Sequence, residues 1–467
     1  MYKYTITFFI VFIFNAAIGQ QINIGKQISI HSEILQSDRE LSVYLPPSYY
    51  ENKIQKYPVL YILDGDYNFR YVTGLIELQS SISENIPEMI VIGISGKGTK
   101  EYRKNCKPNI NVKDKGNADS VLLFLEKELI PYVNSTYKTA NYTILAGHSV
   151  GGIFVTYAAL TKPKLFNNFI AISPALWWEN NALSTIASNT LKNNSNYKAT
   201  VYISLADEKG MKVDDFLKKA TNSLFTINTI YVIIFLFLLL STYLYFRFKG
   251  LSKLKRIVFS SFILTIGILI ALYLQFYYYP TDANFKFKKF SNENHNSVGI
   301  PTYKWALNTI FKTTQVEKKY FKNANDLKVY YNANKNKFSI DLDIPNGLLA
   351  NTVFYILMDD EQELTKINHL ITELYPNKIG YYNSLLLQLY LKNQQFKKAE
   401  SLYKEVIKQV PNSVDLIKSY AEIKKEQHNI DIAKELTKKA IELADSQKLR
   451  QWRKNELIAL EKSINKQ

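Results

Sequence analysis

The sequence predicts an α/β-hydrolase fold, a mostly parallel sheet with helices on both faces, interrupted by a two-helix transmembrane hairpin and followed by an all-helical repeat domain. Three observations carry this prediction. Continuous apolar strand-like runs alternate with helix-like runs up to about residue 222, which is typical of a parallel sheet covered on both faces. Two long uncharged runs follow, and the remaining chain has helical periodicity with a repeat of about 34 residues.

The 467 residues are enough for two or three domains. We expect a signal peptide over 1–19, the first part of the hydrolase over 20–222 and a hairpin insertion over 223–281. The last strand, the catalytic histidine and the last helix of the hydrolase are expected over 282–313, and tetratricopeptide-like repeats over 314–467. The signal peptide is indicated by a lysine near the start, an apolar core and a small-residue cleavage site before Gln20.

Composition excludes several function classes. The single cysteine, Cys106, rules out an intrachain disulfide and a cysteine-rich metal site. The formal net charge is +17, but the lysines alternate with glutamates along helical faces and form no basic block interleaved with aromatic residues. We therefore expect no nucleic-acid partner, no cofactor and no metal.

Seven apolar runs are expected to form the sheet, and an amphipathic helix is expected over 121–133. Most runs are continuous and end at a glycine, serine, proline or acidic residue, as strands of a buried parallel sheet do. The expected strands are Leu41–Leu45 at the edge, Val59–Leu63, Met89–Ile94, Tyr142–Ala146, Phe169–Ile172, Thr200–Leu205 and Phe285–Phe290.

The most informative motif is Gly147-His148-Ser149-Val150-Gly151, which lies between a strand-like run and a helix-like run that starts at Gly152. A serine on a sharp strand-to-helix turn presents its hydroxyl at the carboxyl edge of a parallel sheet, and the following helix N-terminus stabilises an oxyanion. Ser149 is therefore the candidate nucleophile.

A serine nucleophile requires a base, and in α/β-hydrolases the order along the chain is serine, acid, histidine. Among five histidines, only His295 follows the motif within hydrolase-like sequence, on the loop after the last expected strand. His31 precedes the core strands, and His369 and His428 lie in the helical repeats. His295 is therefore the candidate base.

The acid that orients the base is expected where the run Thr200–Leu205 ends. Glu208 is the preferred candidate, and Asp207 is the alternative. The oxyanion hole is expected to use the backbone N–H of Val150 and a second N–H at Gly65 or Asp66. Trp177 and Trp178 follow another strand end, where they either wall a substrate pocket or pack beneath the loop.

The two uncharged runs, Leu224–Phe246 and Ile257–Tyr278, are each long enough to cross a bilayer as a helix. The loop 247–256 between them carries five basic residues in ten, which favours a cytoplasmic loop. We therefore expect an anchor in the inner membrane through 224–278, with the hydrolase and repeat domains on the periplasmic side.

The helical C-terminal region shows a tetratricopeptide-like pattern. Ala399 and Ala433 are about 34 positions apart, and Pro376 and Pro411 are about 35 apart. Small alanines allow paired helices to approach closely. With two clear units and one divergent unit, near the minimum for a solenoid, we expect this region to dock on the hydrolase, to self-associate or to bind a protein partner.

Four stretches together resemble the putative-esterase family of α/β-hydrolases, which includes the esterase D and enterochelin-esterase-like group. They are Tyr57–Gly65, Gly147–Gly152, Ile172–Trp178 and Asn294–Val298. The resemblance implies hydrolysis of carboxylic esters, including siderophore-like esters, by Ser149, His295 and an acid at the position of Glu208. The arginine-rich motif of the family is degraded here to Tyr102–Cys106, which leaves substrate preference open.

The sequence therefore predicts an exported, membrane-anchored serine esterase that works through an acyl-enzyme. The alternative is a catalytically silent hydrolase-like scaffold whose helical tail binds proteins. Retention of a serine, a histidine and an acid in the required order favours the enzyme, because a scaffold needs none of them.

Overall fold

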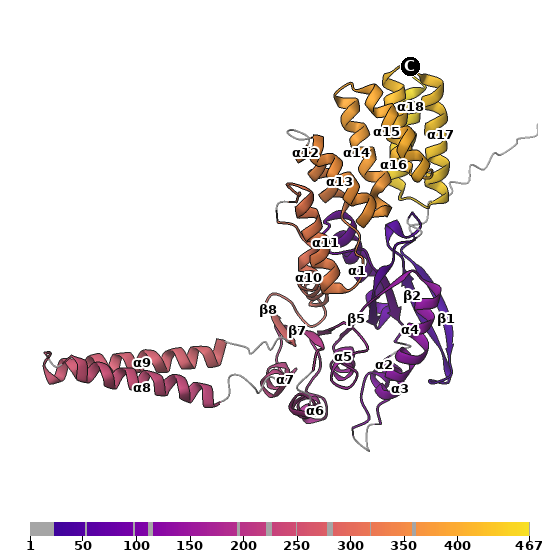
Figure 1. Ribbon diagram of the computed structural model, residues 1–467. Helices are drawn as coiled ribbons and strands as arrows, with labels where there is room; N and C mark the ends of the chain where they lie inside the picture. Colours follow the sequence, from indigo (N-terminus) through magenta and orange to yellow (C-terminus); the bar gives the residue numbers. More distant parts are fainter. Residues whose placement is uncertain are drawn as a thin grey trace, which may run out of the picture.

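We describe the protein from a computed structural model, in which an α/β body carries a stack of helices on one side and a helical hairpin on another (Figure 1). The structure describes residues 23–51, 54–96, 99–110, 115–193, 197–220, 227–248, 250–277, 284–317, 319–356 and 361–466. The expected signal peptide over 1–19 lies outside these residues.

The body is built on one eight-stranded sheet with the strand order β1-β2-β4-β3-β5-β6-β7-β8. The strands from β4 to β8 pair in parallel, whereas β1 and β2 are antiparallel to their neighbours. The strands are β1 Lys26–Ser32, β2 Ser37–Tyr44, β3 Tyr57–Leu63, β4 Ile90–Ile94, β5 Thr139–His148, β6 Asn168–Ile172, β7 Thr200–Ala206 and β8 Phe285–Phe290.

All seven strands expected from the apolar runs are present, but the outer edge strand β1 is not among those expectations. Six of the seven residues of β1 are exposed or only partly buried, so it lacks a continuous apolar run. The expected edge strand, β2, is therefore the second strand of the sheet.

Two cores lie on the two faces of the sheet, because successive strand side chains point to opposite faces. On β3, Val59 and Tyr61 belong to one core, and Leu60 and Ile62 to the other. The first core is covered by α3 Ala118–Phe124, α4 Ile130–Thr136, α5 Val150–Thr161, α6 Trp178–Asn193 and α7 Val213–Ala220. The second is covered by α1 Gly65–Glu77 and α10 Gly299–Ile310.

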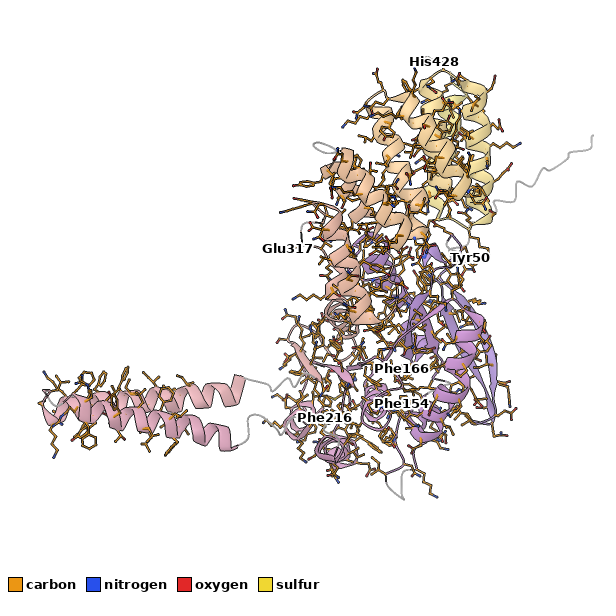
Figure 2. The ribbon with its side chains drawn as sticks, in the orientation of Figure 1. Tyr50, Phe154, Phe166, Phe216, Glu317 and His428 are labelled. Carbon is orange, nitrogen blue, oxygen red and sulfur yellow. The ribbon has the colours of Figure 1, made fainter. Side chains whose placement is uncertain are left out.

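Figure 2 shows Phe154, Phe166 and Phe216 inside the body. The helix α2, Thr99–Asn105, lies between β4 and α3 in the chain.

The insertion between α7 and β8 forms two antiparallel helices, α8 Ile227–Arg247 and α9 Lys253–Tyr277, which project away from the body (Figure 1). Ser241 and Ser260 exchange hydroxyl-to-carbonyl hydrogen bonds of 2.8 and 3.1 Å across the pair. Large apolar side chains of this hairpin are exposed, including Leu236 and Phe262.

The expected transmembrane hairpin is wrong as an assignment: within the described residues, no helix combines the length and the apolar character that a bilayer crossing requires. The first turn of α9 carries Lys253, Lys255 and Arg256. The expected inner-membrane location, with a cytoplasmic loop 247–256 and periplasmic domains, depended on this hairpin. That prediction is therefore wrong as well.

The C-terminal region is helical throughout its described part and lies against the body at the side of α1 and α10 (Figure 1). Its helices pair in sequence order, and Ala399, Ala433 and Ala440 are fully buried where they approach one another. The helices are α11 Ala324–Phe338, α12 Asn346–Ile356, α13 Glu361–Leu374, α14 Ile379–Lys392, α15 Phe396–Gln409, α16 Val414–Glu426, α17 Ile430–Ser446 and α18 Gln451–Ile464.

Candidate active site

Ser149 occupies the turn between β5 and α5, at the carboxyl edge of the sheet, with φ 56° and ψ −110°. A non-glycine residue at positive φ is strained and persists only where its surroundings hold it. Two backbone hydrogen bonds do so here: Ser149 N–H donates to the carbonyl of Ile172 at 2.9 Å, and Ala175 N–H donates to the Ser149 carbonyl at 3.0 Å. The turn is therefore fixed by the neighbouring strand β6.

Close approach explains the glycines around this turn. A Cβ at Gly147 would lie 2.6 Å from the carbonyl oxygen of Gly151. A Cβ at Gly151 would collide with the hydroxyl of Tyr102, which is held in the core. A side chain at Gly147 would therefore push β5 and α5 apart, and one at Gly151 would displace Tyr102 or the start of α5.

His295 and Glu208 meet at the same edge, on the loops that follow β8 and β7. His295 Nδ1 lies 3.0 Å from Glu208 Oε1 and 2.9 Å from Oε2. The side chains are 32% and 18% exposed, so the pair is largely screened from water. This contact joins residues 87 positions apart in the chain.

A small network fixes Glu208, and sequence reasoning missed its central member, Ser173. The fully buried Ser173 donates its hydroxyl to Glu208 Oε1 and accepts a 3.0 Å hydrogen bond from the Ala206 N–H. The Ser173 N–H in turn donates to Ser204 Oγ at 3.3 Å. The only sequence signal was the position of Ser173 at the end of the strand beside β7.

Asp207, the alternative acid, points elsewhere. Its carboxylate lies 3.2 Å from Lys289 Nζ, and its side chain is 63% exposed. Its backbone N–H donates to the carbonyl of Glu293 at 2.8 Å, which joins the loops after β7 and β8. The two adjacent carboxylates thus diverge, and only Glu208 contacts His295.

The structure brings His295 next to the residue before Ser149, but within its described residues it contains no hydrogen bond from the Ser149 hydroxyl. The His148 and His295 rings lie with centroids 4.5 Å apart and planes inclined by 42°. Burial, followed by the neighbouring His295, lowers the pKa of His148 to about 4. His148 is therefore a neutral ring at physiological pH, packed against the His295 imidazole.

The expected oxyanion donors lie in the first turns of two helices. Val150 begins α5, and Gly65 and Asp66 begin α1. First-turn N–H groups have no acceptor within their own helix, so they are available to a ligand. The Asp66 carboxylate accepts a 2.9 Å hydrogen bond from Gly96 N–H, which fixes the α1 turn against the loop after β4. Next to it, burial and the Asp66 charge raise the pKa of Asp64 to about 6.

The two tryptophans have different environments. Trp177 is 54% exposed and lines a cavity beside this edge, whereas Trp178 is 5% exposed and belongs to the core under the loop. Trp178 therefore packs beneath the loop, whereas a substrate-pocket role for Trp177 stays a prediction.

No group of three or more histidine, cysteine, aspartate or glutamate side chains in the described part of the chain could hold a metal ion. Cys106 is buried, and burial holds the pKa of its thiol far above the usual range.

Comparison with known proteins finds esterases among the similar sequences. The family described as "Putative esterase" matches residues 32–220. The uncharacterised protein YbbA of Bacillus subtilis is 28% identical over 187 residues, which cover 38% of this chain and 72% of that protein. Ferri-bacillibactin esterase BesA of the same organism is 30% identical over 142 residues, which cover 26% of this chain and 49% of that esterase.

Among solved structures, the IroE-like serine hydrolase of Shewanella oneidensis is 19% identical with a TM-score of 0.49, covering 76% of this chain and 96% of that chain. The alignment with ferri-bacillibactin esterase spans about half of that protein. The sequence matches support the esterase family for the α/β part of the chain, and they support a carboxylic ester hydrolase.

Proposed function

We propose that this chain is a serine esterase in which Ser149, His295 and Glu208 form a catalytic triad. One observation carries the proposal: His295 Nδ1 is held by Glu208 at 2.9 Å while the same imidazole packs on His148, the residue before Ser149. The acid thereby fixes the tautomer in which Nε2 is free to accept a proton. Ser149 and His295 are not hydrogen-bonded here, and such contacts commonly tighten only when substrate is bound.

In this proposal the Ser149 hydroxyl attacks the ester carbonyl carbon and transfers its proton to His295 Nε2. The tetrahedral oxyanion is stabilised by the N–H of Val150 and by that of Gly65 or Asp66. Collapse breaks the bond to the alcohol, which takes the proton from His295 and leaves an acyl-Ser149. Water then attacks the acyl carbon with His295 again as base, releasing the carboxylic acid and restoring the serine.

We propose a siderophore-type ester as the substrate. Ferri-bacillibactin esterase, whose name states such a substrate, is 30% identical to a region of this chain. Trp177 supplies an exposed aromatic surface at the edge where substrate would sit.

A fluorophosphonate probe tests the triad, since it phosphonylates only an activated serine. We expect one adduct per chain, located at Ser149 by peptide mass spectrometry. The variants Ser149→Ala and His295→Ala should each abolish it, whereas Ser48→Ala, at a serine outside the site, should label normally. Labelling that survives Ser149→Ala would contradict the proposal.

We also propose that the helical region is tetratricopeptide-like, with α12–α13, α14–α15 and α16–α17 as its helix pairs and α18 as a closing helix. The buried alanines support this reading, because small residues let paired helices approach closely. Contact between units is provided by Tyr403 of α15 and Tyr420 of α16, whose rings stack 3.8 Å apart. A partner that binds this region, or self-association through it, remains part of the proposal.

A further inference from the structure

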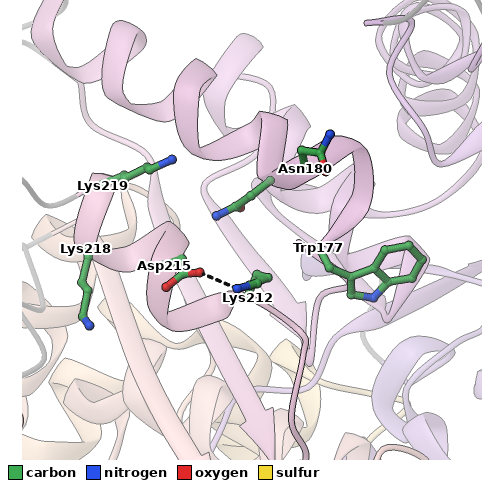
Figure 3. A pocket seen from close by; sticks show the side chains of 7 residues that line it. Trp177, Asn180, Lys212, Asp215, Lys218 and Lys219 are labelled. Carbon is green, nitrogen blue, oxygen red and sulfur yellow. Dashed lines mark ion pairs between the residues drawn. The ribbon is translucent and has the colours of Figure 1, made fainter.

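A cavity of about 450 Å³ lies between α6 and α7 (Figure 3). Its walls include Trp177, which precedes α6, and Asn180 from the start of α6. The other wall is formed by Lys212, which precedes α7, and by Asp215, Lys218 and Lys219 of α7. This volume lies in the range of cavities that hold small molecules or parts of them. The proposed mechanism uses none of these residues.

The two loops that lead into the walls of the cavity begin at the proposed catalytic edge. The loop that reaches Trp177 contains Ala175, whose N–H donates to the Ser149 carbonyl at 3.0 Å. The loop that reaches Lys212 contains Glu208, the partner of His295. These two loops connect the walls of the cavity to the residues that contact Ser149 and His295.

The charges of the cavity are unbalanced. Lys212 Nζ pairs with Asp215 at 3.1 Å. Lys218 and Lys219 form no ion pair with any carboxylate in the part of the chain that the structure describes. Three lysines and one aspartate thus give this wall a positive surplus.

The opposite wall is shaped by an unusual turn. Glu179, Asn180 and Asn181 have φ values of 47°, 51° and 66°, all in the left-handed region. Asn181 is buried and accepts a 2.6 Å hydrogen bond from Ser184 Oγ, which holds the turn. Asn180 lies on this turn and Trp177 precedes it in the chain. Strained turns of this kind concentrate at ligand sites.

We propose that this cavity binds a negatively charged group of the substrate ester, with Lys218 and Lys219 as the specificity-determining cations. The Asn180 amide can donate a hydrogen bond to the same group, and the Trp177 ring can cover its apolar stem. The inference rests on the proposed function, because it assigns a substrate preference to the esterase site. It predicts that an ester with a distal carboxylate is cleaved in preference to a neutral ester of equal length.

Two matched esters test this preference: the mono-4-nitrophenyl ester of adipic acid, which ends in a carboxylate, and 4-nitrophenyl hexanoate, which is neutral. The measurement is the ratio of their kcat/KM values in the full chain at low salt. Replacing Lys218 and Lys219 together by glutamine should lower this ratio about tenfold, which corresponds to about 1.4 kcal/mol. The control is Lys438→Gln with Lys439→Gln, an exposed adjacent pair on α17 with the same charge change, which should leave the ratio unaltered.

The outcomes separate the two proposals. An unchanged kcat/KM ratio in the Lys218/Lys219 variant, or an equal fall of this ratio in the control, overturns the cavity assignment. Cleavage of 4-nitrophenyl hexanoate would still support the esterase in that case. Binding of the adipate ester to the Ser149→Ala variant, followed by calorimetry, gives a second readout that needs no turnover. There the two glutamines should raise Kd about tenfold, and an unchanged Kd contradicts the site.

Discussion

Two adjacent carboxylates, Asp207 and Glu208, illustrate how local geometry divides roles. The chain turns after β7, so that Glu208 contacts His295 and Ser173 while Asp207 reaches Lys289 at the surface. Charge and position in the sequence are nearly the same for both residues. What differs is the neighbour that each side chain meets, and only one neighbour belongs to the proposed triad.

Replacing Glu208 by glutamine should therefore lower kcat for ester hydrolysis on the order of 10³–10⁴-fold, because the amide no longer fixes the required tautomer of His295. Asp207→Asn removes an exposed ion pair, which is worth little, and should change kcat by less than about threefold. Steady-state kinetics of the two variants decide between the residues. The reverse ranking would transfer the role to Asp207.

Ser149→Ala and His295→Ala should each lower kcat/KM by at least about 10³-fold, and the double variant should be no worse than the poorer single one. Triad members act as a unit, so their losses do not add. The measurement is ester turnover alongside thermal unfolding, with unchanged Tm values showing that the fold is intact. Additive losses in the double variant would argue that the two residues act independently.

His148 provides a pH-dependence of the folding stability. Its folded-state pKa of about 4 lies below its usual value of 6.5, so the unfolded chain binds the proton more readily between these values. Stability from this residue is present above pH 6.5 and is lost as pH falls toward 4, by about 3 kcal/mol. His148→Phe keeps an aromatic ring and should remove this part of the pH-dependence in urea unfolding.

The exposed His31 serves as the control for that experiment. Its hydrogen bond with Asp38 raises its pKa, so its contribution is present at low pH and is lost as pH rises. His31→Gln should therefore shift the pH-dependence in the opposite direction to His148→Phe. A pH profile that is the same in His148→Phe and in the original chain would show that His148 titrates normally.

At the scale of elements, local patterns in the sequence predicted most of the strands and the candidate base. Features that depend on contacts between distant parts of the chain were missed. Continuous apolar runs located the strands from β2 to β8, and chain order singled out His295. The edge strand β1 has alternating exposed residues and no such run. The role of Ser173 could not be predicted, because it depends on two neighbouring strands ending at the same level.

The start of α1 gives a prediction at this scale. A Cβ at Gly65 would collide with the backbone of Gly93 in β4, whereas nothing lies within 4 Å of a Cβ at Gly74 on the same helix. Gly65→Ala should therefore cost about 1–3 kcal/mol of unfolding free energy and reduce esterase activity by moving the oxyanion donors. Gly74→Ala should instead stabilise the chain by about 0.5–1 kcal/mol. Urea unfolding of both variants checks the contrast, and equal effects would contradict the close packing of α1.

At the scale of the whole molecule, the helical region docks on the side of the body opposite the catalytic edge. Gly347 N–H donates to Glu84 at 2.8 Å, and Arg450 lies 2.8 Å from Glu77. Thr314 and Gln315 both donate to the carbonyl of Asn85, next to the amino end of β4. The exposed Tyr50 of the body, labelled in Figure 2, lies where the helical region meets the body. Lys448 of the helical region lies 4.5 Å from the centre of its ring. Docking, one of the outcomes considered for this region, is thus present and leaves the carboxyl edge of the sheet uncovered.

Arg453 of α18 is the ion-pair centre of this contact. Its guanidinium donates to Glu51 of the body at 2.8 Å and to Asp415 of α16 at 2.7 Å, and its side chain is 19% exposed. Arg453→Met leaves two carboxylates facing each other without a cation, so it should cost on the order of 3 kcal/mol of docking stability. Lys454→Met removes only a surface pair with Asp445 and should cost less than about 1 kcal/mol.

The loss in Arg453→Met should also depend on pH. Burial raises the pKa of Glu51 in the folded chain even with Arg453 present, so the stability tied to its protonated form is present at low pH and is lost as pH rises through that raised pKa. Without the guanidinium this pKa rises further, and the variant should be closer to the original chain at pH 5 than at pH 7.5. Hydrogen exchange of residues 47–51 and of α18 at both pH values measures the docking directly. We expect these residues to exchange faster in Arg453→Met than in the original chain at pH 7.5 only. An equal increase in exchange rate at both pH values would mean that Arg453 acts through packing and not through its charge.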